Sequence, residues 1–181
     1  MKLKNRILLV LLFLFFISCV TTQIPLPEEA TLLHSVPFFR QDDFQCGPAA
    51  FATVVNYWYM KRETDKNLRL EEIIPEIYSA SARGVLGIDL ELYAKRLGFH
   101  ALQYKGSIED LKNNINRGIP LIMLVDYGIS VYQRNHFIVA TGYTKKGIIV
   151  NSGRKQNELI HNEELNKIWK RTGFWTLIIE P

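Results

Sequence analysis

The chain has 181 residues, the length of a single domain, and 48% of them are hydrophobic and 12% aromatic, which excludes a disordered chain without a core. The net charge is +4, but three of the basic residues (Lys2, Lys4 and Arg6) belong to the first six positions. Without them 19 basic side chains remain against 18 acidic ones, a balance that does not indicate nucleic-acid binding.

The N-terminal segment has the pattern of an export signal. Its basic start is followed by the unbroken apolar run Ile7–Ile17, then by a small residue, Ser18, and a polar stretch. The apolar run is shorter than the ~20 residues that a transmembrane helix needs. We therefore predict that residues 1–18 are a signal peptide.

Cys19 directly follows this signal. The tetrapeptide Phe16–Cys19 resembles a bacterial lipobox, in which the cysteine thiol is acylated and becomes the new N-terminus. The alternative is an ordinary signal peptide with an incidental cysteine. We expect a lipoprotein that is lipidated at Cys19 and exported to the bacterial cell envelope. There it would be anchored on the periplasmic side, at the outer membrane in preference to the inner one.

A tether and a single globular domain are expected after the signal. Residues 19–35 contain Pro25, Pro27 and several polar side chains, which favours a tether, and the globular pattern begins at Val36 and continues to residue 181. A helix is expected to begin at Cys46, because Gly-Pro suits a first helical turn and apolar side chains then recur at helical spacing.

The remaining elements are expected in the order of an α+β protein, with helices first and a mainly antiparallel sheet after them. Glycine, proline and capping residues set their ends. They are a helix at 70–78 weakened by Pro75, a helix at 90–97 capped by Asp89, a strand at 99–104, a helix from a Ser107 cap to residue 116, strands at 119–127, 136–143 and 147–151, a helix capped by Asn162 over 163–171, and a strand at 174–180.

Cys46 is the first candidate for chemistry. It is the only cysteine besides Cys19, so lipidation of Cys19 would leave it without a disulfide partner in the chain. A helix N-terminus favours the thiolate, and a nearby imidazole can take the proton. The alternative is a buried structural cysteine.

His136 is the candidate partner of Cys46. It opens a strand of otherwise apolar residues, so its ring can lie at the rim of the sheet and face a cleft. The other histidines, His34, His100 and His161, have no such setting and are expected to be surface or packing residues.

Two segments carry a resemblance to a known family. Val36–Ala50, which contains Cys46-Gly47-Pro48-Ala49, resembles the nucleophile motif of the bacteriocin-processing, double-glycine-type endopeptidases, and Asn135–Tyr143 resembles their histidine strand. The resemblance covers roughly residues 36–180. It implies a papain-like cysteine peptidase fold with a helical half and an antiparallel sheet. It also implies that Cys46 is the nucleophile and His136 its base.

The resemblance further implies an oxyanion-hole donor before the nucleophile. Gln41 occupies the place of the family's glutamine, and Gln45 is the alternative. A neutral amide can bind a developing oxyanion without titrating itself, and loss of one such donor typically costs ~10²–10³ in rate.

The third catalytic position departs from the family. Its aspartate follows the next strand, where this chain has Asn151-Ser152-Gly153, with Ser152 in the aspartate's place. Either Asn151 or Ser152 can orient an imidazole, but neither stabilises an imidazolium as a carboxylate does. The two remain alternatives, since adjacent strand residues point to opposite faces.

The function expected is that of a cysteine peptidase that cleaves a peptide or protein in the cell envelope by thiolate attack. The alternatives are a catalytically weak or inactive peptide-binding lipoprotein, and an amidase or acyl transferase that uses the same Cys46–His136 pair. The sequence has no pattern for a metal, a cofactor or nucleic acid. The expected partners are the peptide or protein substrate and the membrane.

Overall fold

The computed structural model describes residues 29–40, 45–79 and 84–181. Its elements are β1 (Thr31–Leu32), α2 (Cys46–Lys61), α3 (Leu70–Ile77), β2 (Tyr78–Ser79), β3 (Gly84–Val85), α4 (Gly87–Arg96), β4 (His100–Lys105), α5 (Ile108–Asn116), β5 (Leu121–Asp126), β6 (Asn135–Tyr143), β7 (Gly147–Ser152), β8 (Lys155–His161), α6 (Asn162–Lys170) and β9 (Trp175–Glu180). The expected α+β class is confirmed. The signal segment and Cys19 lie outside the described residues. Within them, no helix combines the length and the apolar character needed to cross a membrane.

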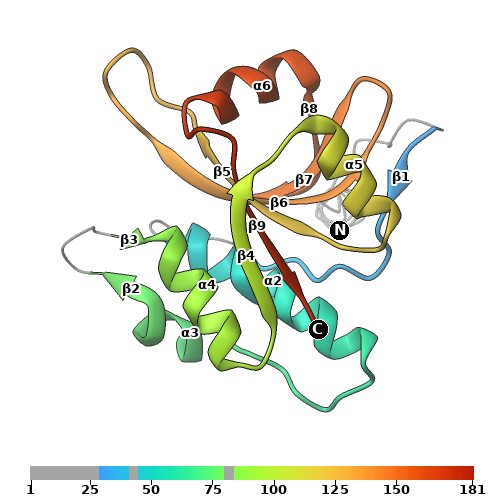
Figure 1. Cartoon of the computed structure of the whole chain (residues 1–181), viewed down its shortest axis with the longest axis vertical. Coiled ribbons are helices and arrows are strands. Elements are labelled where there is room, and N and C mark those ends of the chain that lie inside the picture. Colours follow the sequence, from blue (N-terminus) through green and yellow to red (C-terminus); the bar gives the residue numbers. More distant parts are fainter. Residues whose placement is uncertain (1–28, 41–44, 80–83) are drawn as a thin grey trace, which may run out of the picture.

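One antiparallel sheet organises the molecule. Its strand order is β4-β9-β5-β6-β7-β8, and β1 pairs with β6. β9 comes after all the other strands in the chain, yet it pairs with β4 on one side and with β5 on the other. Figure 1 shows α2, α3 and α4 gathered on one side of this sheet and α5 and α6 on the other.

The alternation of β6 divides the core between these two sides. Phe137 and Val139 face the cluster that contains the buried residues of α2 and α4, whereas Ile138 and Ala140 face the cluster formed with α5 and α6. Successive side chains of a strand point to opposite faces, so a strand with helices on both sides must be apolar at consecutive positions. One face of β6 therefore packs against α2, and the other face packs against the second hydrophobic cluster.

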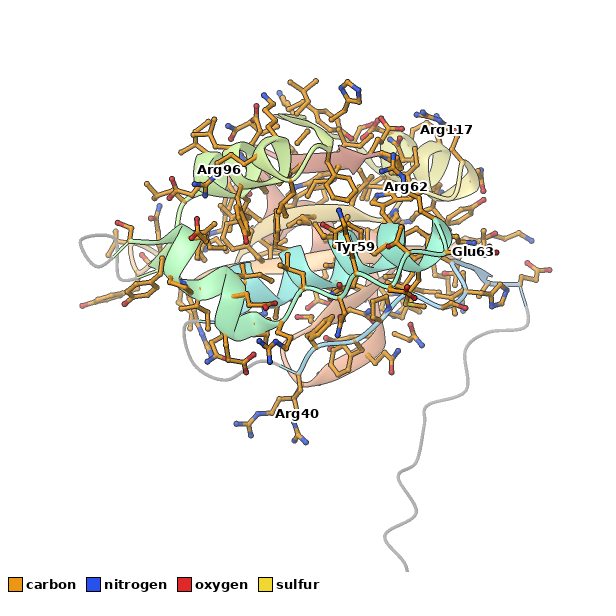
Figure 2. The ribbon with its side chains drawn as sticks, turned by 90° about the horizontal axis from the view of Figure 1, so that it is seen from below. Arg40, Tyr59, Arg62, Glu63, Arg96 and Arg117 are labelled. Atoms are coloured by element: carbon orange, nitrogen blue, oxygen red, sulfur yellow. The ribbon has the colours of Figure 1, made fainter. Side chains whose placement is uncertain are left out.

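On the side of the sheet that carries α2, α3 and α4, two arginine side chains lie over aromatic rings. Arg62, which follows α2, lies over the ring of Phe99 at 5.8 Å, and Arg96 at the end of α4 lies over Tyr93 at 5.0 Å. Arg96 also pairs with Glu76 of α3 at 3.0 Å. Figure 2 labels Arg62 and Arg96, together with Tyr59 of α2, on this side of the molecule. The Arg96–Glu76 pair joins α4 to α3, and the Arg62–Phe99 contact joins the end of α2 to the residue before β4.

Helix ends and one strand differ from the sequence predictions. Ser107 does cap α5, with its hydroxyl accepting the Asp110 amide at 3.0 Å. Asp89 does not cap α4, which begins two residues earlier at Gly87, and Asn162 is the first residue of α6 rather than its cap. β8 was not predicted, because its mostly polar sequence lies at the edge of the sheet and lacks an apolar alternation.

The expected tether contributes to the sheet. Thr31 and Leu32 pair with Tyr143 and Gly142 of β6. A Cβ atom on Gly142 would lie 2.5 Å from the Thr31 carbonyl oxygen, so glycine permits this close approach. The segment before Val36 is thus attached to the strand that carries His136.

Candidate active site

Cys46 is the first residue of α2, so its thiol lies at the N-terminus of a helix whose first turns are buried. The next residue, Gly47, packs against β3. A Cβ atom at Gly47 would lie 2.8 Å from the Val85 Cβ, closer than side chains normally approach. The glycine after the candidate nucleophile is therefore required by packing, as well as by the turn that starts the helix.

The sulfur of Cys46 contacts the strand that carries His136. The backbone N–H of Phe137, the residue after His136, donates a hydrogen bond to the Cys46 sulfur. Burial raises the pKa of the Cys46 thiol, and the amides of Phe137, Gly47 and Cys46 itself only partly oppose this. The N-terminus of α2 alone therefore does not produce a resting thiolate, and Cys46 needs a base to ionise.

His136 is held in a setting that keeps its ring neutral. It is the second residue of β6 and pairs with Val125 of β5. Burial lowers its pKa, the charge of Arg134 lowers it further, and the charge of Glu158 raises it. At neutral pH the imidazole is therefore unprotonated and available to accept a proton, as a general base must be.

Two neighbours border the His136 ring. The Tyr127 ring lies with its centroid 6.0 Å from that of His136, tilted by 52°. A Cβ atom on Gly153 would lie 3.9 Å from Nε2, so this nitrogen faces the turn between β7 and β8. Tyr127 was not singled out from the sequence. Its position at the end of β5, just before the loop that leads to His136, is the signal that could have found it.

Asn151 and Ser152, the two predicted orienting residues, have different surroundings. Asn151 is buried and pairs with Val139; its Oδ1 accepts the Asn157 amide at 3.1 Å, and its Nδ2 has no partner among the described residues. Ser152 donates a hydrogen bond to the Tyr127 phenol and precedes Gly153, which faces the imidazole. Ser152 is thus the one connected to a neighbour of the ring.

The remaining predicted residues lie apart from this contact or outside the described residues. Gln41 belongs to the segment 41–44, which is not described. Gln45 directly precedes Cys46, and its carbonyl accepts the Ala49 amide at 3.0 Å. His34, His100 and His161 are exposed. In the described part of the chain no group of three or more His, Cys, Asp or Glu side chains could hold a metal ion.

The loop that precedes His136 is fixed at its base. Asp126 is almost completely buried, and its Oδ1 accepts the backbone N–H groups of Gly128 and Arg134, both at 2.7 Å. Arg171 donates from Nε to Asp126 Oδ2 at 2.9 Å, and from its other nitrogens to the carbonyls of Gly128 and Ser130. The Arg134 amide, followed by the other donors, holds the pKa of Asp126 below its ordinary value.

The tip of the same loop is apolar and open to solvent. Ile129, Val131 and Tyr132 are 81%, 85% and 80% exposed. Large apolar side chains with this exposure are typical of a surface that contacts another molecule. The sequence analysis did not single out these three residues.

Together these features are compatible with acyl transfer to sulfur. A thiol and a neutral imidazole come from two elements that are distant in the sequence, and backbone amides surround the sulfur. A thiol and a neutral imidazole of this kind can act as a nucleophile and its base.

Comparison with known proteins shows the family to which the chain belongs. No curated protein matches the sequence. A protein from Bacillus anthracis described as a C39-like peptidase matches with a TM-score of 0.69 and 18% identity, over 85% of this chain and 98% of that one. A double-glycine motif protease from the AMS/PCAT transporter, in complex with a leader peptide, matches with a TM-score of 0.63 and 25% identity, over 88% and 99%.

A third solved structure is the peptidase domain of Streptococcus ComA, a bi-functional ABC transporter of a quorum-sensing pathway. It matches with a TM-score of 0.63 and 20% identity, over 80% of this chain and 96% of that one. The expected papain-like fold is confirmed by these likenesses. The model of the Peptidase_C39 like family matches residues 33–176. The chain therefore belongs to the Peptidase_C39 like family of papain-like cysteine peptidases.

Proposed function

We propose that the protein is an active cysteine peptidase of the cell envelope, with Cys46 as nucleophile and His136 as general base. The observation that carries this proposal is the hydrogen bond from the Phe137 amide to the Cys46 sulfur. It brings the thiol against the residue next to His136, although the two belong to a helix and a strand far apart in the chain. Burial keeps the thiol protonated and the imidazole neutral, which is the resting state that general-base activation requires.

The reaction proceeds by acyl transfer to sulfur. His136 takes the proton of the Cys46 thiol, and the sulfur attacks the carbonyl carbon of a peptide bond. The resulting oxyanion is bound by the Cys46 amide and by Gln41, in the role that the family resemblance assigns to it. The imidazolium then gives its proton to the leaving amine as the C–N bond breaks. Water, deprotonated by His136, hydrolyses the thioester and restores the thiol.

The substrate is a peptide or an unfolded stretch of protein outside the cytoplasm. The N-terminal signal and Cys19 support a lipid anchor at the periplasmic side of the envelope, at the outer membrane in preference to the inner one. The leader peptide in the AMS/PCAT structure is the ligand of that protein. An exported chain would not meet a leader that is cleaved in the cytoplasm, so we carry over the extended peptide and not its sequence.

Incubation of the full chain, solubilised in detergent, with a synthetic peptide library should give hydrolysed products detectable by mass spectrometry. An acyl transferase would instead give ligated products when an amine acceptor is added, because the amine replaces water at the thioester. The absence of a carboxylate at Ser152 favours the third candidate, a protein that binds peptides without cleaving them. Bound but intact peptides would identify it and would contradict the proposed function.

The loop tip should favour apolar side chains near the cleaved bond, because Ile129 and Val131 project from a fixed base close to His136. Changing Val131 to Ser should raise KM for apolar substrates several-fold, with kcat and the free energy of unfolding nearly unchanged, since exposed positions contribute little to stability. Steady-state kinetics on matched apolar and polar peptides measures this. Leu102→Ser, an equally simple change on the exposed side of β4, is the control. An equal KM for both variants would show that the loop does not select the substrate.

A further inference from the structure

The orientation of His136 is the least explained part of the proposed site. In this chain Ser152 stands where the family resemblance expects a carboxylate, and Asn151 directs its oxygen to Asn157. A catalytic imidazole must nevertheless be held at one angle and in one tautomer. The orientation of the imidazole must therefore come from the groups that lie next to the ring.

Tyr127 has the contacts that such a support needs. Its ring lies 6.0 Å from the His136 ring, centroid to centroid, and its phenol oxygen accepts a hydrogen bond from Ser152. Gly153, which follows Ser152, faces Nε2 of the imidazole. Tyr127 and the turn between β7 and β8 thus border the His136 ring from two directions, and Ser152 connects the turn to Tyr127.

Hydrogen bonds at the base of the loop fix the backbone of Tyr127. Its backbone N–H donates to the Arg134 carbonyl at 3.0 Å, which closes the base of the loop. The neighbouring Asp126 carboxylate is fixed by two backbone amides and by Arg171. A residue that is anchored in this way can hold a neighbouring ring without moving with it.

We infer that Tyr127 is a positioning residue for His136, and that its ring, which lies beside the imidazole, takes over the role of the orienting carboxylate. The inference rests on the proposed role of His136 as the general base. Tyr127 acts through the imidazole and does not itself touch the reacting atoms.

A neutral positioning group has an electrostatic consequence. Burial raises the pKa of the Tyr127 phenol, so it stays uncharged throughout the working range. The charged groups that act on His136 are then Arg134 of the loop, which disfavours the imidazolium, and Glu158 of β8, which favours it. Glu158 is partly neutralised by Lys155, whose Nζ lies 2.6 Å from its Oε1. The Cys46 thiol, on the helix that packs against β6, is kept uncharged by burial.

Variants of Tyr127 and Ser152 test the inference by two measurements. Tyr127→Leu should lower kcat by about 10²-fold with little change in KM, since a small misplacement of a catalytic group has an effect of this size. Tyr127→Phe should retain most of the activity, because it keeps the ring and loses only the bond to Ser152. Leu102→Ser, on the exposed side of β4, should leave kcat unchanged.

The second measurement does not need turnover. An NMR titration of the His136 ring, assigned with a His136→Gln variant, should show its pKa rising toward the ordinary value in Tyr127→Leu, because water then reaches the ring. In Ser152→Asp the pKa should rise by about 1 to 3 pH units, because an opposite charge favours the imidazolium. The acidic limb of kcat/KM should move to higher pH by the same amount, and Ser152→Asp should restore part of the activity lost in Tyr127→Leu.

The two measurements separate failure of this inference from failure of the proposed function. A titration of His136 that is the same in wild type, Tyr127→Leu and Leu102→Ser would overturn the positioning role, whether or not the protein cleaves peptides. A changed titration in a protein that cleaves nothing would support the positioning role and contradict the peptidase function.

Discussion

Replacing Cys46 with Ala should reduce peptide hydrolysis by at least 10³-fold, because no other side chain among those proposed for the reaction can form the thioester. The change removes one sulfur atom from a half-buried position at the N-terminus of α2 and leaves the backbone of the helix in place. Folding should therefore be retained, and the circular dichroism spectrum should match that of the wild type. The measurement is kcat/KM on the best peptide from the library.

Matched variants separate chemistry from general damage. His136→Gln should cause a loss similar to that of Cys46→Ala, and the double variant should be no worse than either single one, because the two groups act as a unit. His100→Gln changes an exposed histidine on β4 and should have no effect. Full activity in Cys46→Ala would remove the nucleophile from the mechanism and leave a contaminating peptidase as the source of the products.

Replacing Phe51 with Ala should lower the free energy of unfolding by about 3–5 kcal/mol. Phe51 lies one turn beyond Cys46 on α2, is completely buried, and stacks against Tyr93 of α4 with ring centroids 5.2 Å apart. The shorter side chain would leave a cavity between the two helices, because a packed interior closes over such a gap only in part. Urea unfolding followed by circular dichroism measures the change as a lower midpoint with an unchanged slope.

The control for Phe51 is another apolar side chain at the surface. Leu92→Ala on the exposed face of α4 removes a similar class of side chain from a position that is 52% exposed, and surface changes are usually within about 0.5 kcal/mol. Equal losses in the two variants would mean that the interface between α2 and α4 does not form as described. The cysteine would then lack its rigid support.

The sequence predicted the class and most elements because these depend on local patterns. Apolar residues at helical spacing after Cys46 predicted α2, and Ser107 with two acidic residues after it predicted the start of α5. β8 was missed because polar edge strands have no such pattern, and the caps at Asp89 and Asn162 were wrong because neighbouring backbone set those helix ends.

The same distinction applies to the candidate site. Cys46 and His136 stand in short motifs, so the types and the order of these residues can be predicted from the sequence alone. Tyr127 stands in no such motif: its place before the loop is the only signal in the sequence, and its contact with the His136 ring comes from the fold of that loop. The pKa of Cys46 cannot be predicted from the sequence either. The helix N-terminus that lowers this pKa can be predicted, but the burial that raises it more strongly depends on packing between distant segments.

The place of β9 in the sheet has a consequence for the order in which the fold can close. Among the described strands, β4 has β9 as its only partner, and the backbone carbonyl of Ile179 in β9 accepts the indole N–H of Trp58 in α2 at 2.7 Å. Because β9 is also the last strand to be synthesised, β4 can join the sheet only once the C-terminal segment of the chain is available.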